Sequence, residues 1–216
     1  MHPALLIGGA ALCGAGAGAA CIPLVNRYLI KLEKNKLSGK ACAAFIIILA
    51  LLWAATFGVK GWGASAILIA LAASALLSLS WIDWNTYEIP FAYNVFIFAL
   101  GVLALVFDLS HWYEYAIGFV AVSLPLMALF YISKGAAIGG GDVKLMAACG
   151  MLLGWKLVLL GFVLGCIIGS VVHLLRMKIT GERHMLAMGP YLSIGVFLAA
   201  LFGNAAIAWY LSMLGL

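Results

Sequence analysis

Charged residues are scarce in this sequence. They make up 9% of the 216 residues, whereas soluble domains average about 25%. Hydrophobic residues reach 67%, and the mean hydropathy is +1.19. This composition excludes an ordinary soluble domain and indicates one polytopic membrane domain over residues 1–216.

Paired cysteines and grouped histidines are also missing. The five cysteines lie in apolar stretches without a Cys-x-x-Cys pair, and the four histidines are scattered. This pattern excludes a zinc-binding domain and predicts no metal site. The net charge of +5 gathers in a few short loops, which indicates membrane topology rather than affinity for nucleic acid.

Long apolar runs are what the sequence has instead. A membrane-spanning helix needs about 20 apolar residues, and one shorter run, 142–155, follows a glycine triplet. Together these runs predict an all-α polytopic bundle of about eight transmembrane segments. The seven longer runs are 4–25, 41–59, 64–82, 90–107, 112–132, 157–176 and 189–214.

The basic residues orient this bundle. The stretch 27–40 holds five lysines and arginines, so it is predicted to be a cytoplasmic loop. Eight crossings then place the loops 83–89, 133–141 and 177–188 on the cytoplasmic side as well. Two aspartates in or beside these loops therefore belong to one face of the membrane.

These aspartates, Asp83 and Asp142, stand out because the chain has only seven acidic residues. An ionisable group within the membrane costs about 2.5–3.5 kcal/mol on insertion scales and is by default a functional candidate. Each aspartate alone is also explained by helix capping, since Asp142 follows three glycines and Asp83 precedes a helix opened by Pro90. Two carboxyls brought together, however, can share a proton and activate a water.

Two blocks of sequence, with a third near the C-terminus, resemble the type IV prepilin peptidases over about residues 60 to 200. The third block looks like the glycine-proline-aromatic turn that opens the last helix of that family. The blocks are Asp83-x6-Pro90, Gly139-Gly140-Gly141-Asp142-Val143-Lys144-Leu145 and Met188-Gly189-Pro190-Tyr191.

The resemblance implies a membrane-embedded aspartic protease of the Gly-x-Gly-Asp class, with Asp83 and Asp142 as its catalytic pair. Such an enzyme removes the short basic leader peptide from type IV prepilins and pseudopilin-like proteins, which serve pili and protein secretion. It acts at the cytoplasmic face of the bacterial inner membrane. Its partners are then these substrates and the lipid bilayer, and proteolysis needs no cofactor.

The chain also departs from the family. Phe91 stands where the family commonly has Asp or Asn, although that position is outside the catalytic pair. Many bacterial members carry a cysteine-rich cytoplasmic domain between the first two helices and also methylate the new N-terminus with S-adenosylmethionine. The stretch 27–40 contains no cysteine, so this chain resembles a short form, and methylation stays an open possibility.

Several neighbours are candidates for supporting roles. Glu88 and Asp83 make 83–89 the only net-negative cytoplasmic loop, which suits a basic leader, although a solvated loop charge is the plain alternative. Lys144 either tunes Asp142 or holds the substrate, or else it is a snorkelling anchor. Other candidates are the glycines that allow close backbone approach and the residues that open helices. These are Gly139, Gly140, Gly141, Pro90, Gly189 and Pro190.

Two other functions remain open from the sequence. One is a presenilin-like protease that cuts within transmembrane helices, against which the Asp83-x6-Pro90 block argues. The other is a proton-coupled transporter that uses the aspartates as a relay. A relay favours carboxylates deep in the bundle, whereas both aspartates are predicted near one face.

Overall fold

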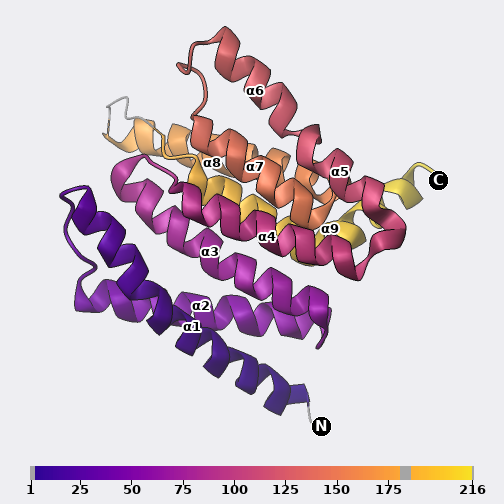
Figure 1. Cartoon of the computed structure of the whole chain (residues 1–216), viewed down its shortest axis with the longest axis horizontal. Coiled ribbons are helices and arrows are strands. Elements are labelled where there is room, and N and C mark those ends of the chain that lie inside the picture. Colours follow the sequence, from indigo (N-terminus) through magenta and orange to yellow (C-terminus); the bar gives the residue numbers. More distant parts are fainter. Residues whose placement is uncertain (1–2, 181–185, 216) are drawn as a thin grey trace. The chain divides into compact units, whose positions relative to one another are not determined.

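The computed structural model describes residues 3–180 and 186–215, and within them the chain is helical, without strands (Figure 1). The helices are α1 Pro3–Lys31, α2 Gly39–Lys60, α3 Ala64–Thr86, α4 Phe91–Phe107, the short 3-10 helix η1 Leu109–His111, α5 Trp112–Ala121, α6 Ser123–Ile132, α7 Gly140–Leu153, α8 Trp155–Thr180 and α9 Gly189–Met213.

The helices confirm the all-α polytopic bundle. Every predicted apolar run lies largely within helix, and in the described part of the chain six stretches are long and apolar enough to cross a membrane. The shorter α4 is also apolar. With 14 residues, α7 extends about 21 Å at 1.5 Å per residue, which is less than the full hydrocarbon thickness of about 30 Å.

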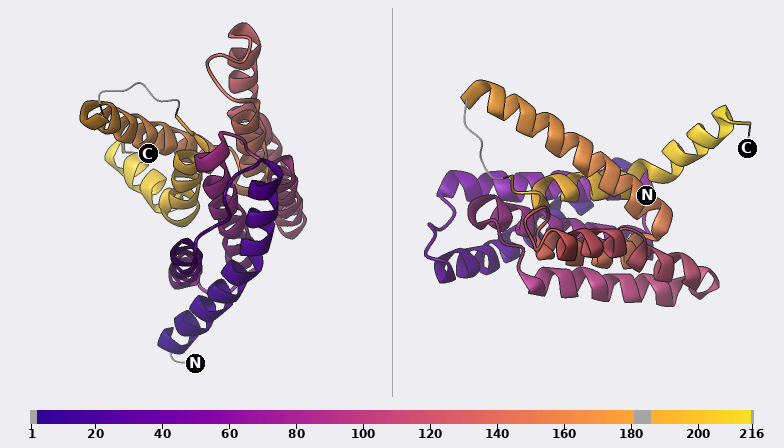
Figure 2. Two further views of the ribbon diagram at one scale, coloured as in Figure 1. Left: turned by 90° about the vertical axis from the view of Figure 1, so that its left-hand side faces the viewer. Right: turned by 90° about the horizontal axis from the view of Figure 1, so that it is seen from above.

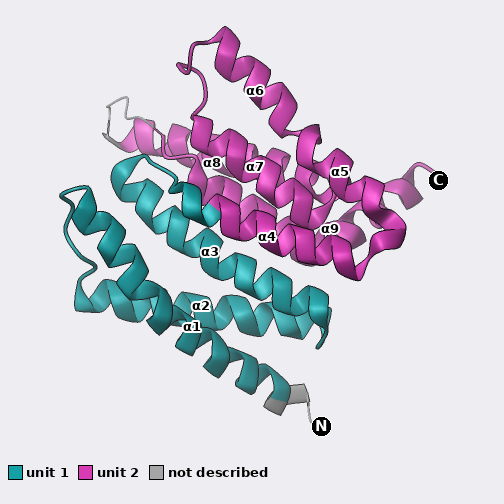
Figure 3. Ribbon diagram, in the orientation of Figure 1, with its two compact units in different colours: residues 1–93 teal, residues 94–216 magenta. Residues whose placement is uncertain are grey.

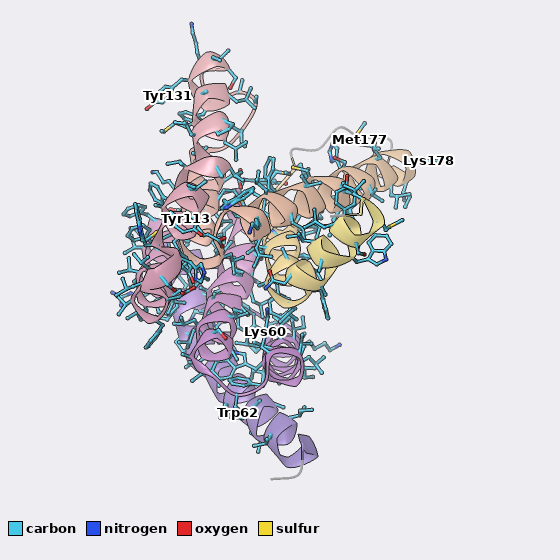
Figure 4. All side chains as sticks on the ribbon, turned by 90° about the vertical axis from the view of Figure 1, so that its right-hand side faces the viewer. Lys60, Trp62, Tyr113, Tyr131, Met177 and Lys178 are labelled. Atoms are coloured by element: carbon cyan, nitrogen blue, oxygen red, sulfur yellow. The ribbon has the colours of Figure 1, made fainter. Side chains whose placement is uncertain are left out.

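The run 112–132 differs from its predicted form, because it is two helices rather than one. Helix α5 ends at Ala121 and α6 begins at Ser123. Pro125 explains the break: its ring clashes with the carbonyl of the residue four positions earlier, which is Ala121, and it has no N–H to donate. In Figure 1 the far part of α6 projects outward, and Figure 4 labels Tyr131 on this part. Helix α6 nevertheless contacts α7, with Phe130 beside Gly140.

Half of the basic stretch 27–40 is helical. Helix α1 continues to Lys31 and α2 begins at Gly39, so only residues 32–38 connect them. The Asn26 side-chain oxygen accepts a hydrogen bond from the Leu37 N–H at 2.8 Å, and the Ser38 hydroxyl caps α2 by accepting from the Ala41 N–H at 3.3 Å. The connection is therefore a short ordered turn.

The chain divides into two compact units, residues 1–93 and 94–216 (Figure 3). In the first unit, α1 and α2 approach closely because Gly14 and Gly18 face Trp53 and Ile46. Small residues allow such close packing between membrane helices. The core beside them consists of Val25, Leu29, Phe45, Leu49 and Ile82. The expectation of a single domain over residues 1–216 stays a prediction.

Helix α7 contacts α5, α6, α8 and α9 of the second unit; Figure 2 gives two further views of the chain. Gly150 of α7 meets Gly118 of α5 backbone to backbone, and a Cβ at Gly101 of α4 would lie 2.8 Å from the α7 backbone at Leu152. Gly154 alone separates α7 from α8 and has a φ of +78°, a conformation that favours glycine.

Helices α4, α7 and α9 of the second unit begin at the same end of that unit. Glu114, near the start of α5, packs against Gly154 at the end of α7, so α4, which precedes α5, ends there too. Helix α8 returns from Gly154, and α9 packs antiparallel to it, with Gly165 beside Leu192 and Gly161 beside Val196. Figure 4 labels Met177 and Lys178 on the far part of α8.

Candidate active site

Asp142 lies in the first turn of α7, three residues after the N-cap Gly139. Its side chain is buried, with 9% of the residue surface exposed. The backbone N–H groups at a helix N-terminus carry partial positive charge and stabilise an anion there, by about 0.3–1 kcal/mol at exposed sites and up to about 2 when partly buried. The fold therefore places Asp142 where a negative carboxylate is favoured.

Gly139 is needed for space beside this carboxylate. Its φ of −74° and ψ of 139° are open to any residue, so the positive φ that glycine permits is not required here. A Cβ at this position, however, would lie 3.1 Å from Oδ2 of Asp142, closer than ordinary contact. Gly140 instead faces the Phe130 ring at 3.6 Å, and Gly141 is half-buried in the first turn.

Asp83 lies in the last turn of α3 and is 5% exposed. Its backbone carbonyl accepts a hydrogen bond from Tyr87 at 2.8 Å, and Tyr87 ends the helix in the left-handed conformation. The carbonyls at a helix C-terminus carry partial negative charge, which disfavours a second negative charge nearby. Asp83 thus has the electrostatic setting opposite to that of Asp142.

Burial separates these two aspartates from the other acidic residues. Six of the seven lie in the described part of the chain, with Glu182 outside it, and of those six only Asp83 and Asp142 are buried. Buried carboxyls are rare unless they are paired or functional. The residues that the sequence selected are therefore the ones that the fold buries.

Glu88 is exposed in the connection between α3 and α4. Its N–H donates to the Thr86 hydroxyl at 3.2 Å, and its carboxylate interacts with the Tyr28 hydroxyl of α1. Glu88 thus lies beside the last turns of α1, which precede the connection 32–38. Pro90 is buried directly before α4.

The remaining candidates lie in the second unit. Lys144 is exposed on α7, while Gly189 is buried at the start of α9 with Pro190 next to it. Because α7 and α9 begin at the same end, the fold brings these residues to the end that holds Asp142. Asp83 belongs to the first unit, so its meeting with Asp142 remains a prediction.

Sequence reasoning missed two polar residues of the second unit. Asn94 and Ser193 are 3% and 6% exposed. Both amide atoms of Asn94 and the hydroxyl of Ser193 lack hydrogen-bond partners among the described residues. The available signal was weak: each is a single polar side chain within an apolar run, a few residues after a proline.

The sequence matches a protein family model over residues 70–174, the type IV leader peptidase family. This stretch contains both buried aspartates and the glycine motif. No solved structure matches the sequence significantly.

Individual proteins that resemble this chain belong to the same class of enzyme by their names. The chain is 30% identical to a prepilin leader peptidase/N-methyltransferase of Aeromonas salmonicida over 162 residues, which is 70% of this chain and 54% of that protein. For the proteins so named in Bacillus subtilis and Pseudomonas aeruginosa, identities are 33% and 30%, covering 56% and 71% of this chain and 50% and 55% of theirs. This chain therefore spans about half the length of these curated relatives. It belongs to the type IV leader peptidase family.

Proposed function

We propose that this protein is a membrane aspartic endopeptidase that uses Asp83 and Asp142 to cut the leader peptide from prepilin-like proteins. The observation that carries the proposal is that these two carboxyls alone are buried among the six acidic residues that the structure describes. Family membership supports the substrate class.

The helix ends support different roles for the two carboxyls in this proposal. Asp142, at the positive end of α7, is the group that holds the negative charge, and Asp83, near the negative end of α3, is the group that keeps the proton. Two like charges a few ångströms apart do not both ionise readily, so the pair titrates as a unit that shares one proton. Opposite settings for two carboxyls are the usual basis of an acid–base pair.

The reaction then follows with its protons balanced. Asp142 takes a proton from a water, whose oxygen forms a bond to the scissile carbonyl carbon. Asp83 gives its proton to the carbonyl oxygen, which yields a neutral tetrahedral diol. The proton on Asp142 next passes to the leaving nitrogen, the C–N bond breaks, and a hydroxyl proton of the diol returns to Asp83. The products are a leader with a free carboxyl and a protein with a free amine.

The substrate is proposed to lie in the bilayer with its apolar helix and to bring its leader junction to the cytoplasmic face of the bacterial inner membrane. Glu88 is the one acidic side chain in the connection 87–90 and is suited to a basic leader residue. Methyl transfer from S-adenosylmethionine is not part of the proposal.

The proposal is tested with purified protein in lipid nanodiscs and a synthetic prepilin that includes the leader and the apolar helix. Mass spectrometry identifies the bond that is cut. Cleavage at the leader junction supports the proposal. Cutting only within the apolar helix indicates a presenilin-like specificity, and uptake of solutes by proteoliposomes without proteolysis indicates a transporter.

A further inference from the structure

Asn94 presents a carboxamide that the described part of the protein leaves without a partner. The residue is 3% exposed, and neither its Oδ1 nor its Nδ2 has a hydrogen-bond partner. A buried polar group without a partner costs free energy, because its hydrogen bonds to water are lost and not replaced. Such a side chain in an apolar helix needs an explanation, and a ligand that forms hydrogen bonds with both atoms would provide one.

The register of α4 against α7 places Asn94 further into the second unit than Asp142, measured from the end at which these helices begin. Gly101 of α4 lies beside Leu152 of α7, and Asn94 precedes Gly101 by seven residues, two helical turns on the same face. Seven residues correspond to about 10 Å, and the ten residues from Asp142 to Leu152 to about 15 Å. Asn94 is therefore about one turn deeper than Asp142.

The surface of α7 at this depth offers no polar side chain to Asn94. Leu145 precedes Leu152 by seven residues, so it lies on the face that α4 contacts, and it is fully buried. Met146 beside it is fully buried as well. The polar atoms of Asn94 thus lie among apolar residues, next to the level of the carboxylate.

Ser193 adds a second group of the same kind. It follows the first residue of α9 by four positions and is 6% exposed, and its hydroxyl lacks a partner among the described residues. Helix α9 contacts α7 as well as α8. Asn94, Ser193 and Asp142 therefore lie within the first one and a half turns of three helices that begin at one end of the second unit.

The backbone of a substrate offers the hydrogen-bond donors and acceptors that Asn94 and Ser193 lack within the described part of the protein. A helix that enters a protease must open at the cut site, and its freed N–H and C=O groups find no water in the bilayer. A carboxamide has donors and an acceptor, as a peptide group does, so one Asn side chain satisfies both atoms of a single peptide group. A hydroxyl satisfies one further group.

We propose that Asn94 and Ser193 bind the backbone of the substrate immediately on the C-terminal side of the cleaved bond, with Asn94 pairing with one peptide group through both of its polar atoms. This inference rests on the proposed function. It assigns Asn94 and Ser193 to substrate binding, and it explains why unpartnered polar atoms persist in an apolar interior.

The first test compares Asn94→Leu with Asn204→Leu, the same change at an exposed asparagine of α9. Asn94→Leu is expected to lower kcat/KM for the synthetic prepilin by about tenfold or more while the thermal unfolding midpoint stays the same or rises, because an unsatisfied amide is removed. Asn204→Leu is expected to change neither. Wild-type cleavage by Asn94→Leu, or a lowered midpoint that marks a structural hydrogen bond, overturns the inference.

The second test identifies the peptide group of the substrate that Asn94 binds. Prepilins in which single peptide bonds after the cut site are replaced by esters lose an N–H donor and have a weaker acceptor. One ester position is expected to lower kcat/KM for the wild type and to have no further effect on Asn94→Leu, because both changes remove the same interaction. Asn94→Thr, which replaces the carboxamide by a hydroxyl that can donate and accept hydrogen bonds, is expected to recover part of the activity.

Ser193→Ala is expected to show the same pattern more weakly, at a different ester position, with Ser170→Ala on the exposed side of α8 as its control. Additive effects of the esters and the substitutions overturn the inference even though cleavage proceeds. If the wild type does not cut prepilin at all, the proposed function fails first, and that result is distinct from normal cleavage by Asn94→Leu.

Discussion

Replacing Gly139 by alanine moves the Asp142 carboxylate without touching either aspartate. The new Cβ would lie 3.1 Å from Oδ2 and 3.9 Å from Cγ of Asp142, so the carboxylate must retreat by a few tenths of an ångström. Alanine adopts the backbone conformation of this residue, φ −74° and ψ 139°, without strain. The perturbation therefore acts on the position of one carboxylate.

The size of the effect follows from the sensitivity of catalysis to position. A misplacement of about 1 Å can lower a rate about 100-fold, so a shift of a few tenths is expected to lower kcat about tenfold, equivalent to about 1.4 kcal/mol of barrier. Stability is expected to change by less than about 1 kcal/mol, because alanine stiffens the unfolded chain but is a poorer N-cap than glycine.

Initial rates of prepilin cleavage and thermal unfolding of the same preparations measure both quantities. Gly140→Ala is the matched control, since its Cβ would meet the Phe130 ring at an ordinary 3.6 Å, and it is expected to cut within about threefold of the wild type, less than 1 kcal/mol of barrier. Equal kcat for Gly139→Ala and the wild type would refute the argument that Gly139 makes room for the carboxylate.

The other predictions concern the motif, metal independence and methylation. Gly141→Val is expected to lower activity by well over tenfold, a loss of more than about 1.4 kcal/mol of transition-state stabilisation. Normal cleavage by an inserted, folded variant would show that Gly141 serves only to begin the helix. Activity is expected to survive a chelator, because the described residues hold no cluster of metal-ligand type; loss in chelator with recovery in zinc contradicts the mechanism. With S-adenosylmethionine added, the cut product is expected to gain little or no methyl mass, and a stoichiometric gain shows that the turn 32–38 suffices for a bifunctional enzyme.

Hydropathy predicted the helices well, because the membrane imposes a simple rule on composition. The scarcity of acidic residues singled out the two aspartates that the fold buries, whereas the orientation predicted from the charges stays a prediction. Helix ends were less accurate. Helix α1 continues to Lys31 because lysine and arginine are good helix formers with long side chains that reach water from a helix. The break at Val122 was missed because hydropathy does not register what Pro125 does to the backbone.

The part of the site that a sequence motif marks could be predicted, and the part that depends on packing could not. Asp142 and Gly139 were found from their motif, yet the reason for the glycine, space beside Oδ2, depends on where the carboxylate lies in α7. Asn94 and Ser193 were missed because a lone polar residue in an apolar run is uninformative until the fold shows that it is buried without a partner. The predicted approach of Asp83 to Asp142 joins two separate units, which no local pattern determines.

The measurement closest to the central claim is cleavage of a synthetic prepilin by the wild type, Asp83→Asn, Asp142→Asn and the double variant, each inserted and folded. Since two carboxyls that share a proton act as one unit, each single change is expected to abolish cleavage, and the double variant is expected to be no worse than either. A single variant that retains near wild-type turnover would contradict the assignment of Asp83 and Asp142 as the catalytic pair.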